Sequence, residues 1–215
     1  MLEVKQIVEQ TSYGATKPLI IVANNNKKYI LKFRNSSDYD NEKDLHIFNE
    51  YLAYKLIELY NFKISPQKLE FILIDDYTVA LAEKACTNKF ISYESLTFLK
   101  KSLGTNIAIE FLENTEKANA DDINVKSFRN QVKHIDNYIL NNDRIKENTN
   151  VLKDLNASER YYAIDYGLAM LDNRIYEAII DGKIDNVQLQ EELELITNYS
   201  QHLSLTIDDF RNFFK

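Results

Sequence analysis

The sequence has 215 residues, of which 45% are hydrophobic and 27% charged, a composition typical of a folded globular protein and unlike that of a disordered chain. Its 33 acidic and 26 basic residues give a formal net charge of -7, which disfavours nucleic acid as a partner because phosphate backbones are also negative. The single cysteine, Cys86, excludes an internal disulfide and a cysteine-based zinc cluster.

The sequence contains no recognisable targeting or membrane segment. Its first residues carry charge where a signal peptide would need an apolar run, and nowhere are about 18 consecutive residues apolar. We therefore expect a cytoplasmic protein without a membrane span. The three histidines, His46, His134 and His202, are far apart in the sequence and form no known metal-binding motif.

The first third of the sequence is rich in strand patterns. The apolar runs 18–23 and 28–33 are separated by a polar turn and predict a β-hairpin. A second hairpin is predicted from the runs 71–74 and 77–82, which two aspartates join. Strand patterns are rare after this point, so we expect the boundary between two lobes within residues 83–87.

A turn of small residues lies between two of these strand patterns, at residues 12–16. Gly14, Ala15 and Thr16 would let backbone N–H groups approach a phosphate. A plain turn has the same composition, so this signal alone is weak. It becomes a candidate phosphate-binding loop only together with the motifs described below.

One helix is predicted within the strand-rich region, between residues 42 and 60, from apolar side chains at helical spacing: Leu45, Phe48, Leu52, Leu56 and Leu59. Lys32 lies in the strand before it, within an apolar run where an ammonium group is costly unless it meets an anion. Lys32 therefore either contacts phosphate or occupies the solvent face of the strand. Glu50 is either its ion-pair partner, as in kinases, or a residue of the helix surface.

The most regular helical pattern begins near residue 125, where apolar residues recur every three or four positions: Val125, Phe128, Val132, Ile135 and Ile139. We expect this helix to end near residue 140. A polar loop and a β-hairpin follow it, and the hairpin ends at Asp165 with Gly167 in the next turn. Residues 173–215 alternate apolar and charged side chains in helical fashion and are predicted to be helical.

The polar loop and the end of the hairpin supply three side chains that suit phosphoryl transfer. This reaction needs a carboxylate that orients the acceptor hydroxyl, and an amide and a second carboxylate that hold Mg²⁺ on the ATP phosphates. Asp143, Asn148 and Asp165 supply these groups in the order that kinases use. The alternative is that they are solvated loop residues in a chain rich in asparagine.

These elements together predict an α+β, two-lobed protein-kinase-like fold. Residues 1–85 would form a β-rich N-lobe with an antiparallel sheet and one helix, which binds ATP. Residues 86–215 would form a mainly helical C-lobe that carries the catalytic loop and the metal site. The two lobes would make up one kinase-like domain.

Five motifs in this order resemble the HipA-like kinase family and, more distantly, the phosphoinositide kinases. They are GATKP at 14–18, YILKF at 29–33, NEYLA at 49–53, the stretch 136–150, and AIDYG at 163–167. The stretch from Asn141 to Arg144, together with Asn148 and Asn150, is the most specific part. Tyr166 departs from the family pattern, because many members have histidine there.

The resemblance implies roles for individual residues. Asp143 would be the catalytic carboxylate, Asn148 and Asp165 would bind magnesium, and Lys32 would contact the ATP phosphates. Leu81 would begin a hinge over the adenine, continued by the next two residues.

The predicted hinge comprises Leu81, Ala82 and Glu83, whose backbone groups would recognise the base. Arg144, in the catalytic loop, would either neutralise charge near the transferring phosphate or brace the loop through Asp136, a charge-assisted contact. We favour the bracing role.

The resemblance implies an ATP- and Mg²⁺-dependent serine/threonine protein kinase with a protein hydroxyl as acceptor. Some members of the family are toxins of toxin–antitoxin systems, so an antitoxin partner is left open. Two other hypotheses are a kinase-shaped binding module that has lost catalysis and a small-molecule or lipid kinase.

Overall fold

The computed structural model describes residues 1–12, 17–34, 47, 50, 51, 53, 54, 57, 64–138, 141, 144, 149–157 and 159–167, with the backbone alone at 134, 137 and 138. Five predicted site residues lie outside the described residues: Gly14, Ala15, Thr16, Asp143 and Asn148. The predicted helical segment 173–215 lies outside them as well. The chain divides into two compact units, Met1–Ile47 with Pro66–Asn114 and Phe48–Ser65 with Thr115–Lys215.

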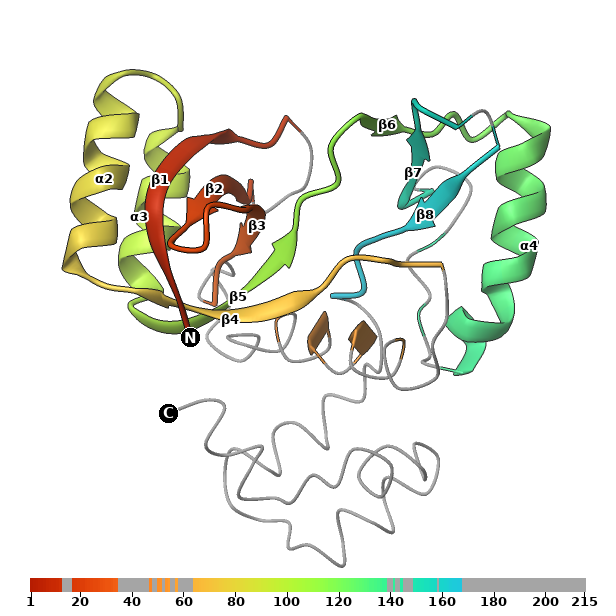
Figure 1. Ribbon diagram of the computed structural model, residues 1–215, viewed down its shortest axis with the longest axis horizontal. Helices are drawn as coiled ribbons and strands as arrows, with labels where there is room; N and C mark the ends of the chain where they lie inside the picture. Colours follow the sequence, from red (N-terminus) through yellow and green to blue (C-terminus); the bar gives the residue numbers. More distant parts are fainter. Residues whose placement is uncertain are drawn as a thin grey trace, which may run out of the picture. The chain divides into compact units, whose positions relative to one another are not determined.

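The first unit is built around a closed five-stranded barrel with the order β1-β2-β3-β5-β4 (Figure 1). Its strands are β1 (Leu2–Gln10), β2 (Leu19–Ala23), β3 (Lys28–Lys32), β4 (Leu69–Ile74) and β5 (Gly104–Glu110). Four of the neighbouring pairs are antiparallel. A short parallel pairing of β4 with β1 closes the barrel, so each strand has a partner on both sides.

The predicted hairpin of residues 18–33 is confirmed as β2 and β3, which pair antiparallel with Ile21 opposite Tyr29. Its polar turn has two local reasons to form. The side chain of Asn25 accepts a hydrogen bond from the backbone N–H of Lys27 at 3.0 Å. Asn26 adopts a φ of 63°, a left-handed conformation that asparagine tolerates better than most residues.

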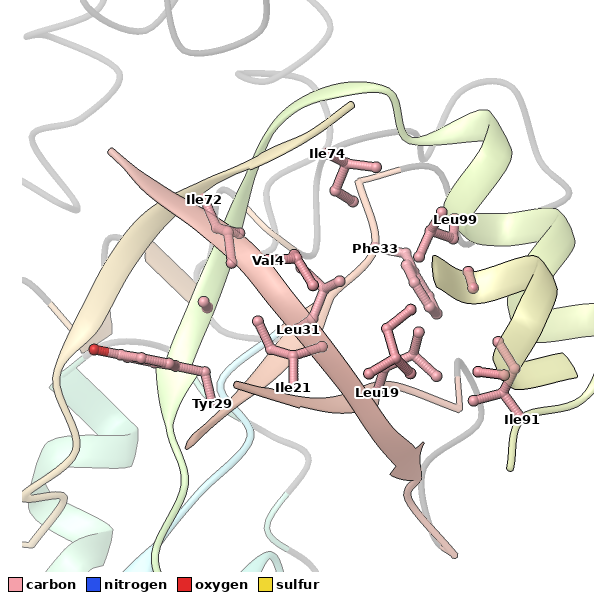
Figure 2. Packing of buried hydrophobic residues seen from close by; sticks show 14 of the residues in the cluster. Val4, Leu19, Ile21, Tyr29, Leu31, Phe33, Ile72, Ile74, Ile91 and Leu99 are labelled. Carbon is pink, nitrogen blue, oxygen red and sulfur yellow. The ribbon is translucent and has the colours of Figure 1, made fainter. Parts of the chain in front are cut away.

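The barrel interior is filled by apolar side chains that alternate along the strands, as a period of two requires. In Figure 2, Ile21 and Leu31 from the hairpin pack close to Val4 of β1 and Ile72 of β4. The strands and the helices beside them share one core. Its largest fully buried members are Leu19, Ile21, Leu31, Ile72, Ile74 and Leu99.

Two helices, α2 (Asp76–Thr87) and α3 (Tyr93–Lys101), pack beside the barrel and join its core. The strand predicted over residues 77–82 is therefore wrong. Asp75 caps α2, because its side chain accepts hydrogen bonds from the backbone N–H of Thr78 at 2.8 Å and from its hydroxyl at 2.7 Å. Such a cap satisfies backbone donors that a helix start leaves unpaired.

The expected lobe boundary between residues 85 and 86 falls inside α2. The first unit instead continues to Asn114, because β5 returns to the barrel and lies between β3 and β4. Phe98 of α3 and Phe33 after β3 have ring centroids 6.2 Å apart. The segment after residue 85 therefore supplies both a strand and part of the core of the first unit.

The helix predicted between residues 42 and 60 agrees with the described residues of that segment, all of which are helical: Ile47, Glu50, Tyr51, Ala53, Tyr54 and Ile57. Four of these side chains are buried and apolar or aromatic. Together with Glu50, which is also buried, they occupy positions 47, 50, 53, 54 and 57, as expected of one buried helix face.

The second unit contains α4 (Ile123–Tyr138) and a sheet of β6 (Thr115–Lys117), β7 (Val151–Asp154) and β8 (Tyr161–Ala163) in the order β6-β7-β8. The predicted helix and the predicted hairpin after the polar loop are both confirmed. Val125 on the apolar stripe of α4 packs in a small core with Val151 and Tyr161. The α+β class is thus confirmed for the described part of the chain.

None of the helices within the described ranges combines the length and apolar character of a membrane span.

Candidate functional site

Arg144 is the centre of a buried polar network in the second unit. Its Nε donates to Oδ2 of Asp136 at 2.9 Å, and the side chains of Arg144 and Asp136 are only 2% and 9% exposed. Asp136 belongs to α4, eight positions before Arg144 in the sequence. The bracing role predicted for Arg144 is therefore confirmed, since the pair ties the polar loop to the helix that precedes it.

The same guanidinium group also ties two backbone segments together. Its Nη1 donates to the carbonyl oxygens of Thr149 at 3.4 Å and Ile164 at 3.2 Å, and to that of Asn150. The backbone N–H of Ile164 donates to the carbonyl of Asn150 at 2.9 Å. The segment that follows Asn148 in the sequence and the segment that precedes Asp165 thus lie side by side.

Further hydrogen bonds hold Asp136 and the backbone carbonyl of Arg144. Asn141 donates from Nδ2 to Oδ1 of Asp136 at 2.9 Å, and its backbone N–H donates to the carbonyl of the same aspartate at 2.7 Å. Arg129 of α4 donates from Nη2 to the carbonyl of Arg144 at 3.1 Å. Both carboxylate oxygens of Asp136 are therefore paired, as a buried carboxylate requires.

Asp165 follows β8 directly after this tie and has an unusual backbone conformation. Its φ is 61°, in the left-handed region that few residues other than glycine adopt, although aspartate is among the more tolerant. Such a conformation costs free energy and persists where the surroundings hold it, often at functional sites. The Arg144 and Asn150 contacts to Ile164 supply that restraint on the preceding residue.

Tyr166, which departs from the family pattern, is fully buried. Its hydroxyl forms a hydrogen bond with Oγ of Ser65 at 2.7 Å, and Ser65 also donates to the carbonyl of Ala163. The ring of Tyr54 meets the Tyr166 ring edge-on, with centroids 5.5 Å apart, and the guanidinium of Arg144 lies 5.2 Å from the same ring. Tyrosine thus contributes a cation–π contact and a polar tip at one position.

Burial changes the acidity of both tyrosines at this site. It raises the pKa of Tyr166 to about 12, although the charge of Arg144 and the hydrogen bond with Ser65 act in the opposite direction. Burial also raises the pKa of Tyr54 well above its ordinary value, and the nearby charge of Glu50 adds to the effect. Both phenols are therefore neutral near pH 7 and serve as hydrogen-bonding and packing groups.

Lys32 and Glu50 lie in different units, and their predicted ion pair stays a prediction. Lys32 ends β3, where it pairs with Ile107 of β5, and its side chain is half-buried on the face opposite to that of Leu31. Glu50 is 2% exposed on a helical segment of the second unit. Its burial argues against the alternative that it merely decorates a helix surface.

The residues predicted to form the adenine hinge, Leu81, Ala82 and Glu83, all lie in the interior of α2. In an α-helix the interior backbone N–H and C=O groups bond to each other, so they have no backbone edge to offer a base. Ala82 is fully buried, and Glu83 pairs with Lys100 at 2.7 Å on the surface. The helix argues against the hinge role, which depended on the strand that was wrongly predicted here.

The predicted metal site is represented among the described residues by Asp165. No group of three or more His, Cys, Asp or Glu side chains in the described ranges is placed to hold a metal ion. Carboxylate and amide oxygens are ligands that Mg²⁺ prefers, so the donor chemistry of Asp165 and Asn148 fits that ion. Their assignment remains a prediction, as does the catalytic role of Asp143.

Several contributors to the site were not identified from the sequence, among them Ser65, Tyr54 and the backbone carbonyl of Ile164. Ser65 lies about a hundred positions from its partners, and a single serine in a polar segment gives no signal. Tyr54 was missed because the helix was predicted from a stripe that includes Leu52 and Leu56, and residues two positions apart do not share a helix face. A backbone carbonyl carries no sequence signal at all.

Comparison with known proteins identifies the fold. No family model matches the chain, and no curated protein matches it either. A crystal structure of the Golgi casein kinase aligns with 99% of this chain and 70% of that protein's chain, with a TM-score of 0.51 and 12% identity. Another, described as the same kinase with Mn/ADP bound, aligns over the same shares with a TM-score of 0.46 and 9% identity. The first likeness shows that this chain has a protein-kinase-like fold.

Proposed function

We propose that this chain is an ATP- and Mg²⁺-dependent phosphotransferase. The observation that carries the proposal is the Arg144 network, which ties the residues after Asn148 to the residue before Asp165. Loop and strand end are held together by a buried cation at the place where the sequence puts the catalytic loop and a metal-binding aspartate. The kinase-like fold supports the same reading.

In the proposed reaction, the oxygen of the acceptor hydroxyl forms a bond to the γ-phosphorus. The Asp143 carboxylate accepts the proton that this hydroxyl loses. The bond from the γ-phosphorus to the bridging oxygen breaks, and ADP leaves with that electron pair. Asn148 and Asp165 would hold Mg²⁺, which neutralises charge on the phosphates when bound. Lys32 would contact the phosphates, and the turn of Gly14, Ala15 and Thr16 would offer them backbone N–H groups.

The acceptor that we propose is a serine or threonine hydroxyl of a protein. This assignment depends on the resemblance of the sequence motifs to the HipA-like kinases, of which the stretch from Asn141 to Arg144 is the most specific. No matched family or curated protein supports a role in a toxin–antitoxin system, and we do not propose one. The hinge residues of α2 are also left out of the proposed nucleotide site.

Incubation with ATP and Mg²⁺ tests the proposal, with phosphorylation of the chain itself or of added protein read by intact mass. We expect turnover that Asp143→Ala and Asp165→Asn each reduce to background without loss of folding. Asp121→Asn, an exposed carboxylate of the second unit, is the matched control and should retain full turnover.

Thermal shift with ATP provides the second measurement, because it separates binding from chemistry. A shift without turnover would contradict transfer and favour an inactive kinase-like module. Phosphate found only on a lipid or small molecule would support phosphotransferase activity and contradict the proposal that the acceptor is a protein. Neither a shift nor turnover would overturn the proposal as a whole.

A further inference from the structure

The second unit has a cavity of about 410 Å³ whose lining is mostly basic, beside the Arg144 network. It is lined by Lys126, Arg129, Asn130, Lys133, Asp136, Asn141 and Arg144. A cavity of this size falls within the range of pockets that hold small ligands, about 300–1,000 Å³. It therefore has room for more than a single bound ion.

One face of α4 supplies most of the lining. Lys126, Arg129, Asn130 and Lys133 follow one another at positions i, i+3, i+4 and i+7, which places them on one side of a helix. This face is distinct from the apolar stripe of Val125, which is buried in the small core. The polar side of α4 thus carries three basic side chains close together, although any polar side chains would keep that side of the helix solvated.

The cavity keeps its positive charge even though a carboxylate lines it. Both oxygens of Asp136 accept hydrogen bonds, one from Arg144 and one from Asn141. The charge of that carboxylate is therefore offset by the Arg144 guanidinium. Lys126, Arg129 and Lys133 then remain as net positive charge in a protein whose formal net charge is -7.

The donors of the cavity retain capacity for a ligand. Arg129 uses Nη2 to hold the carbonyl of Arg144, which fixes its guanidinium group while other N–H groups of the fork can still donate. Lys126 is exposed and its Nζ donates to the carbonyl of Asp121 at 3.1 Å. Lys133 is exposed as well. Arginine and lysine together are the usual donors to phosphate oxygens.

We propose that this cavity binds a small polyanion that carries several phosphate groups. Arg129 would be the fixed donor, with Lys126 and Lys133 closing on the ligand from the two ends of the helix face. These lysines lie seven positions apart, about 10 Å along the helix axis, a span that suits linked phosphates better than one. Arg144, which braces the proposed catalytic loop, also lines the cavity, but the proposal does not rest on the proposed transfer.

Calorimetric titration of the full chain with inorganic tripolyphosphate, in the absence of magnesium, tests the proposal. We expect the double variant Lys126→Gln, Lys133→Gln to weaken binding at least tenfold. The matched control Lys117→Gln, Lys153→Gln removes the same charge from the sheet of the second unit and should change binding less than twofold. Equal weakening by both double variants would show that the effect comes from net charge alone and would overturn the proposal that the cavity is the binding site.

Two further arms make the result specific. Co-sedimentation with phosphatidylcholine vesicles containing a phosphorylated inositol lipid asks whether the ligand is a headgroup. Loss of that binding in the cavity variant supports a headgroup, whereas binding of free tripolyphosphate alone supports a soluble ligand. Absence of both kinds of binding, or tripolyphosphate binding unaffected by the cavity variant, would overturn the proposal.

Nucleotide binding is followed in the same variants, so that this proposal and the proposed function fail separately. The ATP-dependent thermal shift should be unchanged in the cavity variant. Lysine-dependent tripolyphosphate binding in a chain that shows no ATP shift would support the cavity and contradict the phosphotransferase. Arg129→Gln, in a protein whose circular dichroism spectrum matches that of the parent, should also weaken tripolyphosphate binding.

Discussion

The barrel of the first unit and the Arg144 network of the second unit are each stabilised by a different kind of interaction. The barrel depends on many apolar contacts, among them those of Leu19, Ile21 and Leu31. The network depends on a few charged and polar groups, with Arg144 and Asp136 at its centre. Apolar cores tolerate exchange of side chains of similar volume, whereas removal of one partner from a buried ion pair leaves a desolvated charge. Conservative substitutions in the barrel should therefore cost little stability, whereas loss of one charged partner from the network should cost much more.

The largest expected effect comes from breaking the network at its cation. Arg144→Met leaves the Asp136 carboxylate buried without a counter-ion, at an expected cost of about 3–5 kcal/mol in the free energy of unfolding. Hydrogen exchange read by mass spectrometry measures it, because peptides from α4 and from β7 and β8 report on the second unit alone. The first unit should keep its protection.

The double variant Asp136→Asn, Arg144→Met serves as the control for this prediction. Since it removes both charges, part of the lost stability should return. If Arg144→Met alone costs less than about 1 kcal/mol, a typical surface pair, the network does not hold the second unit and the comparison with the barrel fails.

A smaller effect is expected in the barrel. Leu31→Ala removes a fully buried side chain and should cost about 2–4 kcal/mol, with lost protection confined to the first unit. Leu31→Met, which nearly conserves volume, should cost less than about 1.5 kcal/mol. The chain has no tryptophan, so urea unfolding is followed by circular dichroism. Equal losses for Ala and Met would contradict the view that the barrel tolerates repacking.

The smallest effect near neutral pH is expected for Tyr166→Phe, which removes the hydroxyl bonded to Ser65. The cost should be about 1 kcal/mol at pH 7. Because burial raises the pKa of Tyr166 to about 12 from its ordinary 10, the native state holds this proton more tightly than the unfolded state. The contribution of Tyr166 is therefore complete below pH 10 and is lost as the pH rises towards 12.

The alkaline limb of the stability curve measures this contribution. Tyr166→Phe should flatten the loss of stability between pH 10 and 12 relative to the parent. Tyr77→Phe, at a tyrosine that is 62% exposed, is the matched control and should leave the curve unchanged. A parallel shift of both curves would place the alkaline loss in other groups.

The elements found from the sequence are those whose pattern is set locally. The hairpin of β2 and β3 has two short apolar runs joined by a turn of asparagines, and α4 has a stripe at helical spacing from Val125 onwards. Both therefore agree with the structure. In the site, the contact of Arg144 with Asp136 was also predictable, since both carry complementary charge a few positions apart.

The elements that were missed depend on tertiary partners or on a cap. Residues 77–82 alternate like a strand, but the Asp75 cap and the alanines that follow favour a helix, and Ala82 packs into the barrel core. The run of β5 is short and apolar, so nothing local says that it lies between β3 and β4. The carbonyl acceptors of Arg144 and the reach of Ser65 across the chain leave no trace in residue type.

The position of β5 in the barrel has a practical consequence for dissecting this protein. A fragment that stops at residue 85 would lack the strand that bonds to both β3 and β4. Those two strands would then expose open edges, which recruit other chains and aggregate. We expect the soluble form of the first unit to require Gly104–Glu110, supplied in the same chain or added back as a peptide.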